Sequence, residues 1–157
     1  MAVEFSLETK QEFEAIVARY PKKEAAMLPV LYLAQREFGY LSSDAIEYVA
    51  KLMGQTPARV EGVVSFYTML YMKPVGRHHV QVCRTLPCAL AGAARITELI
   101  KKTLGVEVGQ TTADGRFTLS EVECLASCGT GPMMQVNDDY YENLTEEKTK
   151  EILNSLK

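Results

Sequence analysis

Four cysteines constrain this 157-residue chain more than any other feature of its sequence. They are all the cysteines that the chain has, and they form two tight pairs, Cys83 with Cys88 in a C-x4-C run and Cys124 with Cys128 in a C-x3-C run. Thirty-five residues separate the two pairs. Two loops that each supply two thiolates are typical of a site with four ligands, so the first hypothesis is a four-thiolate metal site.

Three simpler interpretations fit this spacing less well. Structural zinc usually takes C-x2-C pairs or adds histidine, and the two histidines, His78 and His79, are neighbours in a predicted strand, where their side chains point to opposite faces. We therefore expect both to be ordinary strand and surface residues. A disulfide pair needs an oxidising compartment, and the N-terminal residues lack the basic start and apolar core of a secretory signal. A dithiol oxidoreductase would need C-x2-C at the start of a helix.

An iron-sulfur cluster matches the number and grouping of the thiols. A [2Fe-2S] cluster contains two irons that each take two terminal thiolates, so two cysteine pairs satisfy it with none left over. Our working hypothesis places Cys83 and Cys88 on one iron and Cys124 and Cys128 on the other. The second pair lies among small residues that let backbone N–H groups approach sulfur closely, namely Ala126, Ser127, Gly129 and Gly131.

Three runs carry a specific resemblance: VEGVVSFYTML, VCRTLPCALAGA and ECLASCGTGPMMQVND. Together they resemble the thioredoxin-like [2Fe-2S] ferredoxin family, to which the binuclear-cluster component of NADH-quinone oxidoreductase, respiratory complex I, belongs. The similarity covers nearly the whole chain. It implies a redox subunit with one [2Fe-2S] cluster beside a separate flavin-bearing subunit that oxidises NADH and holds FMN. It also places Pro132 where this fold often keeps a cis-proline.

Other assignments stay open beside this one. The equivalent subunit of an NAD-linked hydrogenase or formate dehydrogenase shares the module and its thiol spacing, and a zinc interaction module on the four thiolates is an alternative of a different class. A stand-alone ferredoxin is disfavoured, because a free carrier would not need the helical extension of about seventy residues that precedes the cysteines.

Composition excludes several functions. With 47% hydrophobic residues and no apolar run long enough for a bilayer, we expect no direct membrane insertion. The net charge is -3 without a basic block, which argues against a nucleic-acid partner. Residues 129–131, Gly-Thr-Gly, lack the rest of a dinucleotide fingerprint, so NADH and FMN would bind on the partner. We expect a cytoplasmic protein, peripheral on the cytoplasmic side of the inner membrane as part of a complex.

The predicted fold is an α+β chain in two parts. Residues 1–73 are expected to form a helical bundle for partner docking, residues 74–77 a linker, and residues 78–157 a thioredoxin-like α/β domain with the cluster. In the bundle, a capping box at Thr9 and Glu12, and caps at Ser42 or Ser43 and at Thr56, mark three helix starts.

The end of the bundle and the α/β part give further expectations. Phe66, Tyr67 and Leu70 belong to an aromatic-rich stretch that we interpret as part of a docking surface, with core packing as the alternative for each residue. Alternation in HHVQV predicts a strand that ends at Cys83. After Cys88, the sequence to Gly105 predicts one helix, followed by a strand before Cys124, a terminal hairpin and a helix capped by Thr145.

Overall fold

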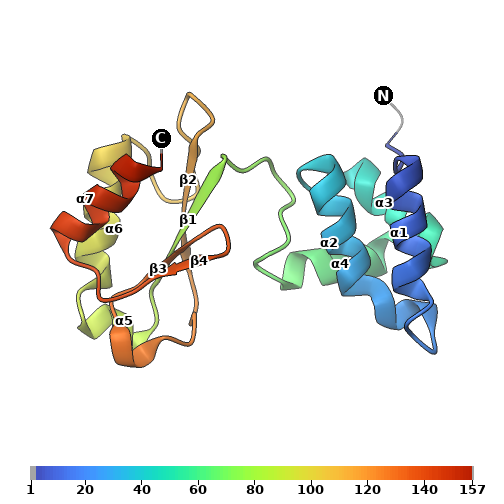
Figure 1. Ribbon diagram of the computed structural model, residues 1–157, viewed down its shortest axis with the longest axis horizontal. Helices are drawn as coiled ribbons and strands as arrows, with labels where there is room; N and C mark the ends of the chain where they lie inside the picture. Colours follow the sequence, from blue (N-terminus) through green and yellow to red (C-terminus); the bar gives the residue numbers. More distant parts are fainter. Residues whose placement is uncertain (1–2, 157) are drawn as a thin grey trace. The chain divides into compact units, whose positions relative to one another are not determined.

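The computed structural model describes residues 3–156, and the chain divides into two compact units, Met1–Pro74 and Val75–Lys157. The first unit is helical, and the second contains a sheet with helices (Figure 1). The prediction of a helical part followed by an α/β part is therefore confirmed. No helix within residues 3–156 is both long enough and apolar enough to cross a bilayer.

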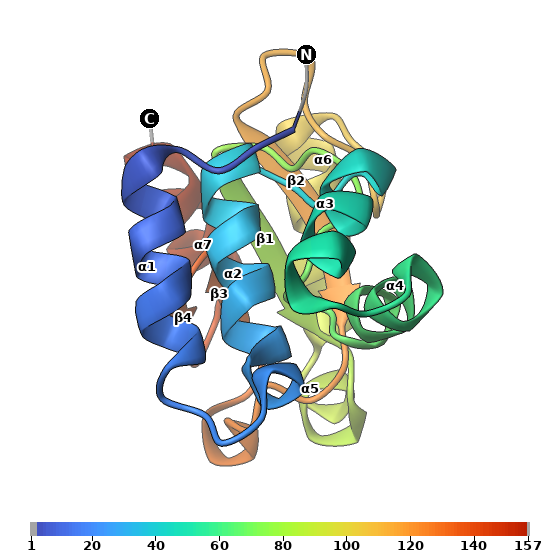
Figure 2. The same cartoon turned by 90° about the vertical axis from the view of Figure 1, so that its right-hand side faces the viewer.

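The described part of the first unit contains α1 (Leu7–Val17), the short 3-10 helix η1 (Lys23–Ala26), α2 (Met27–Phe38), α3 (Ser43–Met53) and α4 (Pro57–Phe66). Helix α2 contacts both α1 and α3, and α3 contacts α4 (Figure 2). The hydroxyls of Ser42 and Thr56 cap α3 and α4 as predicted, by accepting from the third backbone N–H that follows each of them. Gly54 ends α3 in the left-handed conformation that glycine adopts without strain.

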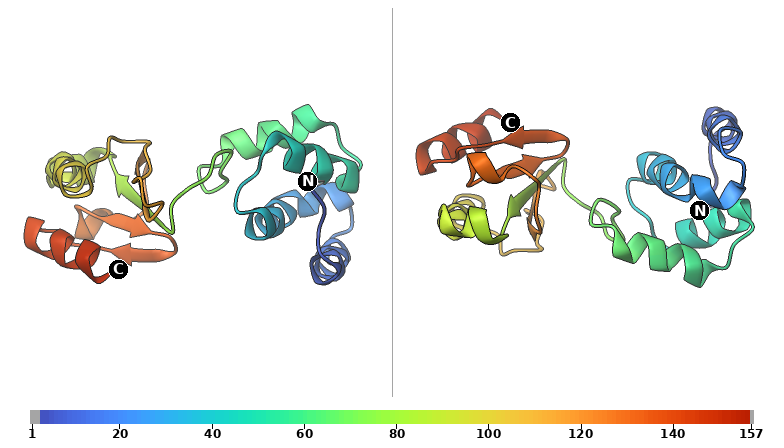
Figure 3. Two further views of the ribbon diagram at one scale, coloured as in Figure 1. Left: turned by 90° about the horizontal axis from the view of Figure 1, so that it is seen from above. Right: turned by 90° about the horizontal axis from the view of Figure 1, so that it is seen from below.

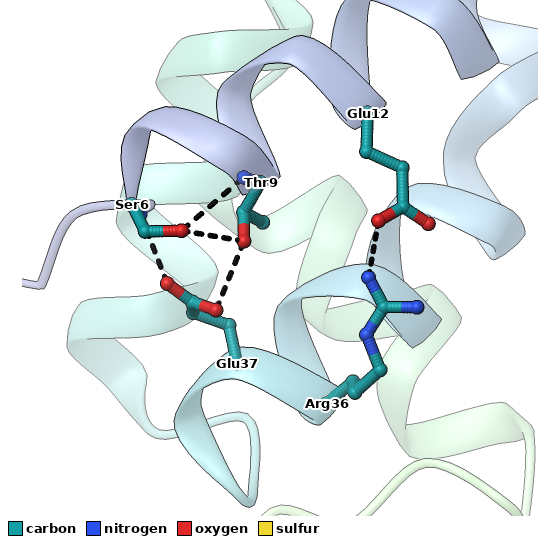
Figure 4. A network of polar contacts seen from close by, with 5 residues as sticks. All are labelled: Ser6, Thr9, Glu12, Arg36 and Glu37. Carbon is teal, nitrogen blue, oxygen red and sulfur yellow. Dashed lines mark hydrogen bonds and ion pairs between the residues drawn. The ribbon is translucent and has the colours of Figure 1, made fainter.

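The start of α1 corrects one prediction, because Ser6 and not Thr9 caps the helix (Figure 4). Ser6 Oγ accepts from the Thr9 backbone N–H at 3.2 Å. The Glu37 carboxylate of α2 accepts from the Ser6 backbone N–H and from Thr9 Oγ1, each at 2.9 Å, and these donors hold the Glu37 pKa below its usual value. Glu12 forms an ion pair with Arg36 and does not reach back to the cap.

The core of the first unit includes one residue that the sequence pattern places in the docking surface. Leu70 is only 5% exposed and packs with the other buried side chains of this unit. Phe66 is 76% exposed, and Tyr67 packs against its ring at a centroid distance of 5.0 Å. Leu70 therefore does not belong to the predicted docking surface, whereas Phe66 keeps that role as a prediction. The apolar residues Met69 and Met72 are also exposed.

The second unit contains β1 (His78–Cys83), α5 (Leu86–Leu90), α6 (Ala93–Leu104), β2 (Phe117–Val122), the 3-10 helix η2 (Cys128–Thr130), β3 (Met134–Val136), β4 (Asp139–Tyr141) and α7 (Glu146–Ser155). The sheet order is β2-β1-β3-β4, with β1 and β2 parallel and the other pairs antiparallel. Helices α6 and α7 lie on the same side of the sheet (Figure 3). Their apolar residues join those of the strands in one core.

The helix expected after Cys88 is two helices, α5 and α6, and this corrects the prediction. Gly92 lies between them with φ +100°, a conformation that interrupts a right-handed helix and that glycine tolerates. Gly105 ends α6 as expected, Thr145 caps α7, and β3 and β4 form the predicted hairpin. The Gly131–Pro132 peptide bond is cis, in agreement with the family resemblance.

His79 differs from the expectation of a surface residue. It is 6% exposed, and its Nε2 lies 2.8 Å from Ser120 Oγ on the neighbouring strand. Burial lowers the pKa of His79 to about 4, so this side chain is neutral in the folded protein at pH 7.

Candidate metal centre

The parallel pairing of β1 and β2 brings the two cysteine loops to one edge of the sheet. Cys83, the last residue of β1, pairs with Val122, the last residue of β2, and Cys124 follows two residues later. The Arg84 backbone N–H donates to the Val122 carbonyl at 3.0 Å. Because the carboxyl ends of parallel strands meet at the same edge, each strand delivers the first cysteine of its pair to the same place.

Cys88 completes the first pair and packs against the loop that follows the second. It lies in α5, with its thiol buried. A Cβ atom built on Gly131 would be only 3.2 Å from Cys88 Sγ, so the absence of a side chain at position 131 makes room for this sulfur. The Cys83 backbone N–H donates to the Met133 carbonyl at 3.2 Å, which ties the end of β1 to the same loop.

Backbone donors favour the thiolate form of Cys83. Burial is the largest single influence and opposes ionisation, but the backbone N–H groups of Leu125 and Thr85 bond to this sulfur, as do the side chains of Cys88 and Thr85. Together they lower the pKa of Cys83 below its usual value. A donor from Leu125, which lies between the cysteines of the second pair, shows that the second loop reaches the first pair.

The pKa values of Cys88 and Cys128 are raised, in part by the other cysteine of each pair. The pKa of Cys88 is raised by burial and by the hydrogen bond and charge of Cys83, with a smaller contribution from the charge of Cys128. The pKa of Cys128 is raised by the hydrogen bond and charge of Cys124, then by burial and by the charge of Cys83. The thiols therefore group in two pairs, each within hydrogen-bond reach, and charge at one pair is felt at the other.

The surroundings of these thiols fit a sulfur-rich, negatively charged group. Thr85 Oγ1 is buried without an oxygen or nitrogen partner among the described residues, and it lies beside the Cys83 sulfur. The Ala126 backbone N–H donates to Cys124 Sγ at 3.3 Å. Within residues 3–156, no group of three or more histidine, cysteine, aspartate or glutamate side chains is placed to hold a metal ion. The cysteines thus lie as two separate pairs, and their role as the four ligands of one binuclear cluster stays a prediction.

Burial differs between the two pairs. Cys83 and Cys88 are buried, whereas Cys124 and Cys128 are exposed. An ion pair between Arg84 and Glu123 links the residue after Cys83 to the residue before Cys124 across the outside of the site. Both of its side chains are largely exposed, so its contribution to stability is small.

One set of contacts at this site is not indicated by the sequence pattern. Glu142, which follows β4, accepts hydrogen bonds from the hydroxyls of Ser127 and Thr130, on either side of Cys128. No local pattern indicates such contacts, because Glu142 is twelve residues from Thr130 along the chain. The only related signal in the sequence is the predicted terminal hairpin, which reverses the chain before Glu142.

The fold and site define a thioredoxin-like domain with two cysteine pairs at one edge of its sheet, preceded by a helical unit. The chain belongs to the thioredoxin-like [2Fe-2S] ferredoxin family, whose model matches residues 13–157. This confirms the predicted family and the predicted [2Fe-2S] cofactor. The assignment of individual cysteines to the cluster stays a prediction.

Individual relatives carry names that agree with one another. The E subunit of NADH-quinone oxidoreductase from Rickettsia conorii is 47% identical over 146 residues, which cover 91% of this chain and 87% of that protein. Mitochondrial NADH dehydrogenase [ubiquinone] flavoprotein 2 of Dictyostelium discoideum is 44% identical over 157 residues, covering 98% of this chain and 64% of that protein.

A solved structure shares the fold. It is an NAD+-reducing [NiFe]-hydrogenase in the air-oxidized state, with a TM-score of 0.72 and 18% identity. The match covers 83% of this chain and 22% of the hydrogenase chain. At this identity the likeness describes the fold alone.

Proposed function

We propose that this chain is an electron-transfer subunit that carries one [2Fe-2S] cluster next to the FMN-bearing, NADH-oxidising subunit of an NADH-quinone oxidoreductase. The single observation that carries the proposal is the meeting of two cysteine pairs at the ends of two parallel strands. The names of relatives with 44% and 47% identity support the choice of complex.

In this proposal Cys83 and Cys88 bind one iron and Cys124 and Cys128 bind the other. When bound, the cluster supplies the ability to take up and release one electron. The nearby backbone N–H groups of Leu125 and Thr85 favour negative charge on the Cys83 sulfur, and that of Met133 favours it on the Cys88 sulfur. Burial shields the Cys83 and Cys88 side from water, while the exposed second pair lies where a partner can approach.

The chain itself makes and breaks no bonds in a substrate. Its residues hold the thiolates, direct N–H groups at sulfur and restrict the access of water, and NADH and FMN belong to the partner subunit. Rigid strand ends at Cys83 and Val122 limit reorganisation when charge arrives. We place the assembly on the cytoplasmic side of the inner membrane, with this chain peripheral to the lipid.

Residues 1–73 serve as the docking unit, residues 74–77 as a linker and residues 78–157 as the cluster domain. Phe66 is 76% exposed and begins an exposed apolar stretch with Met69 and Met72. Large exposed apolar side chains are common at the centres of protein interfaces. Phe66→Ala is expected to weaken co-purification with the flavin subunit, whereas the control Leu7→Ala, which also removes an exposed apolar side chain from this unit, is expected to leave it unchanged.

Purification of the native assembly tests the proposal as a whole. An NADH-quinone oxidoreductase subunit should co-purify with FMN and with quinone-reducing activity, and addition of NADH should bleach the visible absorbance of this chain. Hydrogenase or formate dehydrogenase subunits in place of these would select the alternative complex. A colourless protein with zinc would overturn the assignment, because zinc has no visible absorbance.

A further inference from the structure

The Glu142 carboxylate binds the two hydroxyl side chains that flank Cys128. Thr130 Oγ1 donates to Glu142 Oε1 at 2.6 Å, and Ser127 Oγ donates to the same oxygen. The two hydroxyls also lie 2.6 Å from each other. Ser127 directly precedes Cys128 and Thr130 follows it by two residues, so one carboxylate oxygen holds both ends of η2.

Backbone contacts from the same segment support this hold on the cysteine loop. The Asn143 backbone N–H donates to the Thr130 carbonyl at 2.7 Å, and the Leu144 backbone N–H donates to the Pro132 carbonyl at 3.0 Å. Tyr140 Oη donates to the Leu125 carbonyl at 3.0 Å. Helix η2 has no side-chain cap of its own. Residues 140–144 therefore fix the position of the loop that presents Cys128.

We propose that Glu142 is a positioning residue for the cluster: it holds Cys128 in place through Ser127 and Thr130 and keeps the reduction potential low. The inference rests on the proposed function, because it concerns the [2Fe-2S] cluster that this loop would ligate. In that function the bound cluster would take up one electron from a reduced flavin of the partner, with no bond formed or broken.

Two physical effects act in the same direction. A carboxylate half-buried beside the Cys128 loop places negative charge near the cluster, and negative charge disfavours the added electron. The carboxylate also accepts the Ser127 and Thr130 hydroxyl protons, which are then not donated to sulfur. Hydrogen bonds to cluster sulfur raise the potential, so diverting these donors lowers it.

Glu123 offers a matched control. It also carries a carboxylate beside a predicted ligand, since it directly precedes Cys124, but its side chain is exposed and paired with Arg84. Water and salt screen an exposed charge more strongly than a half-buried one. Glu123→Gln therefore removes the same formal charge without releasing a hydroxyl of the Cys128 loop.

The experiment measures the midpoint potential of the full chain with its cluster bound, by titration monitored through visible absorbance and electron paramagnetic resonance. Glu142→Gln removes the charge but keeps an acceptor, and Glu142→Ala removes both. We expect the potential to rise from wild type to Glu142→Gln and to rise further in Glu142→Ala. Glu123→Gln should shift it less than Glu142→Gln does.

A double-variant cycle separates the hydroxyl contacts from charge alone. When Ser127→Ala and Thr130→Val are already present, Glu142→Ala, which removes the acceptor as well as the charge, should give a smaller shift than it gives in the wild-type chain. An equal shift in both backgrounds would overturn the role assigned to the hydroxyls. If Glu142→Ala loses its cluster, the potential of Glu142→Gln, compared with wild type and with Glu123→Gln, still tests the role of the Glu142 charge.

The outcomes keep this inference distinct from the proposed function. A wild-type chain with iron and sulfide, in which Glu142→Gln has the potential of wild type or of Glu123→Gln, overturns this inference alone. A wild-type chain purified anaerobically without iron and sulfide overturns the proposed function, and this inference with it.

Discussion

Gly131→Ala is expected to loosen the cluster by crowding Cys88. The new Cβ would lie 3.2 Å from Cys88 Sγ, 3.5 Å from Cys88 Cα and 3.7 Å from Ala91 Cβ. The backbone of Gly131, with φ -69° and ψ 158°, suits alanine, so the effect comes from this contact and not from backbone strain. Relief requires a shift of a few tenths of an ångström at a predicted iron ligand.

The magnitude follows from what an extra carbon costs in a well-packed site, about 1–3 kcal/mol. If this cost destabilises only the folded state with its cluster bound, the equilibrium for cluster loss shifts by roughly 5- to 150-fold, since about 1.4 kcal/mol corresponds to a factor of ten. Gly129→Ala is the matched control, because a Cβ at Gly129 meets nothing within 4 Å. It adds the same methyl group two residues away in the same loop.

The assay is the rate at which visible absorbance disappears after an iron chelator is added to the anaerobic protein. Gly131→Ala should lose its cluster faster than wild type, and Gly129→Ala should match wild type. Equal rates for all three proteins would refute the close packing of Cys88 against position 131. A faster rate for Gly129→Ala than for Gly131→Ala would refute it as well.

Three further predictions concern the ligands, acid stability and the helical unit. Cys124→Ala should abolish or strongly impair cluster assembly, measured as iron per chain, because one iron would lack a thiolate; full iron content would contradict the ligand assignment. The pKa of His79 is about 4 in the folded protein, below its ordinary value near 6.5, which the unfolded chain keeps. As the pH falls from 6.5 toward 4, the unfolded chain therefore binds a proton at His79 that the folded protein does not bind. The free energy of unfolding should drop by about 1 kcal/mol between pH 7.5 and 5.5 in wild type and not in His79→Gln; parallel losses would contradict this. Gly62→Ala should stabilise the helical unit by about 0.5–1 kcal/mol in denaturant unfolding, because position 62 is inside α4 with open space around it, and a loss of stability would contradict the free space assigned there.

Local chemistry made much of the fold predictable. The caps at Ser42, Thr56 and Thr145 need only a hydroxyl placed three residues before a helical N–H, a relation that is visible in the sequence. The strand that ends at Cys83 follows from alternation, and the helix end at Gly105 follows from the conformational freedom of glycine.

Features that depend on distant partners were not predictable in the same way. Ser6 caps α1 in a network with Glu37 of α2, thirty-one residues along the chain. Leu70 and His79 have ordinary sequence surroundings, and only tertiary packing buries them. The hold of Glu142 on the Cys128 loop likewise arises from the return of the chain after β4.

The measurement that tests the central claim most directly is the iron and acid-labile sulfide content of the anaerobically purified chain. The account predicts about two irons and two sulfides per chain, with visible absorbance that is lost on reduction. Zinc in place of iron, or iron without sulfide, would contradict it.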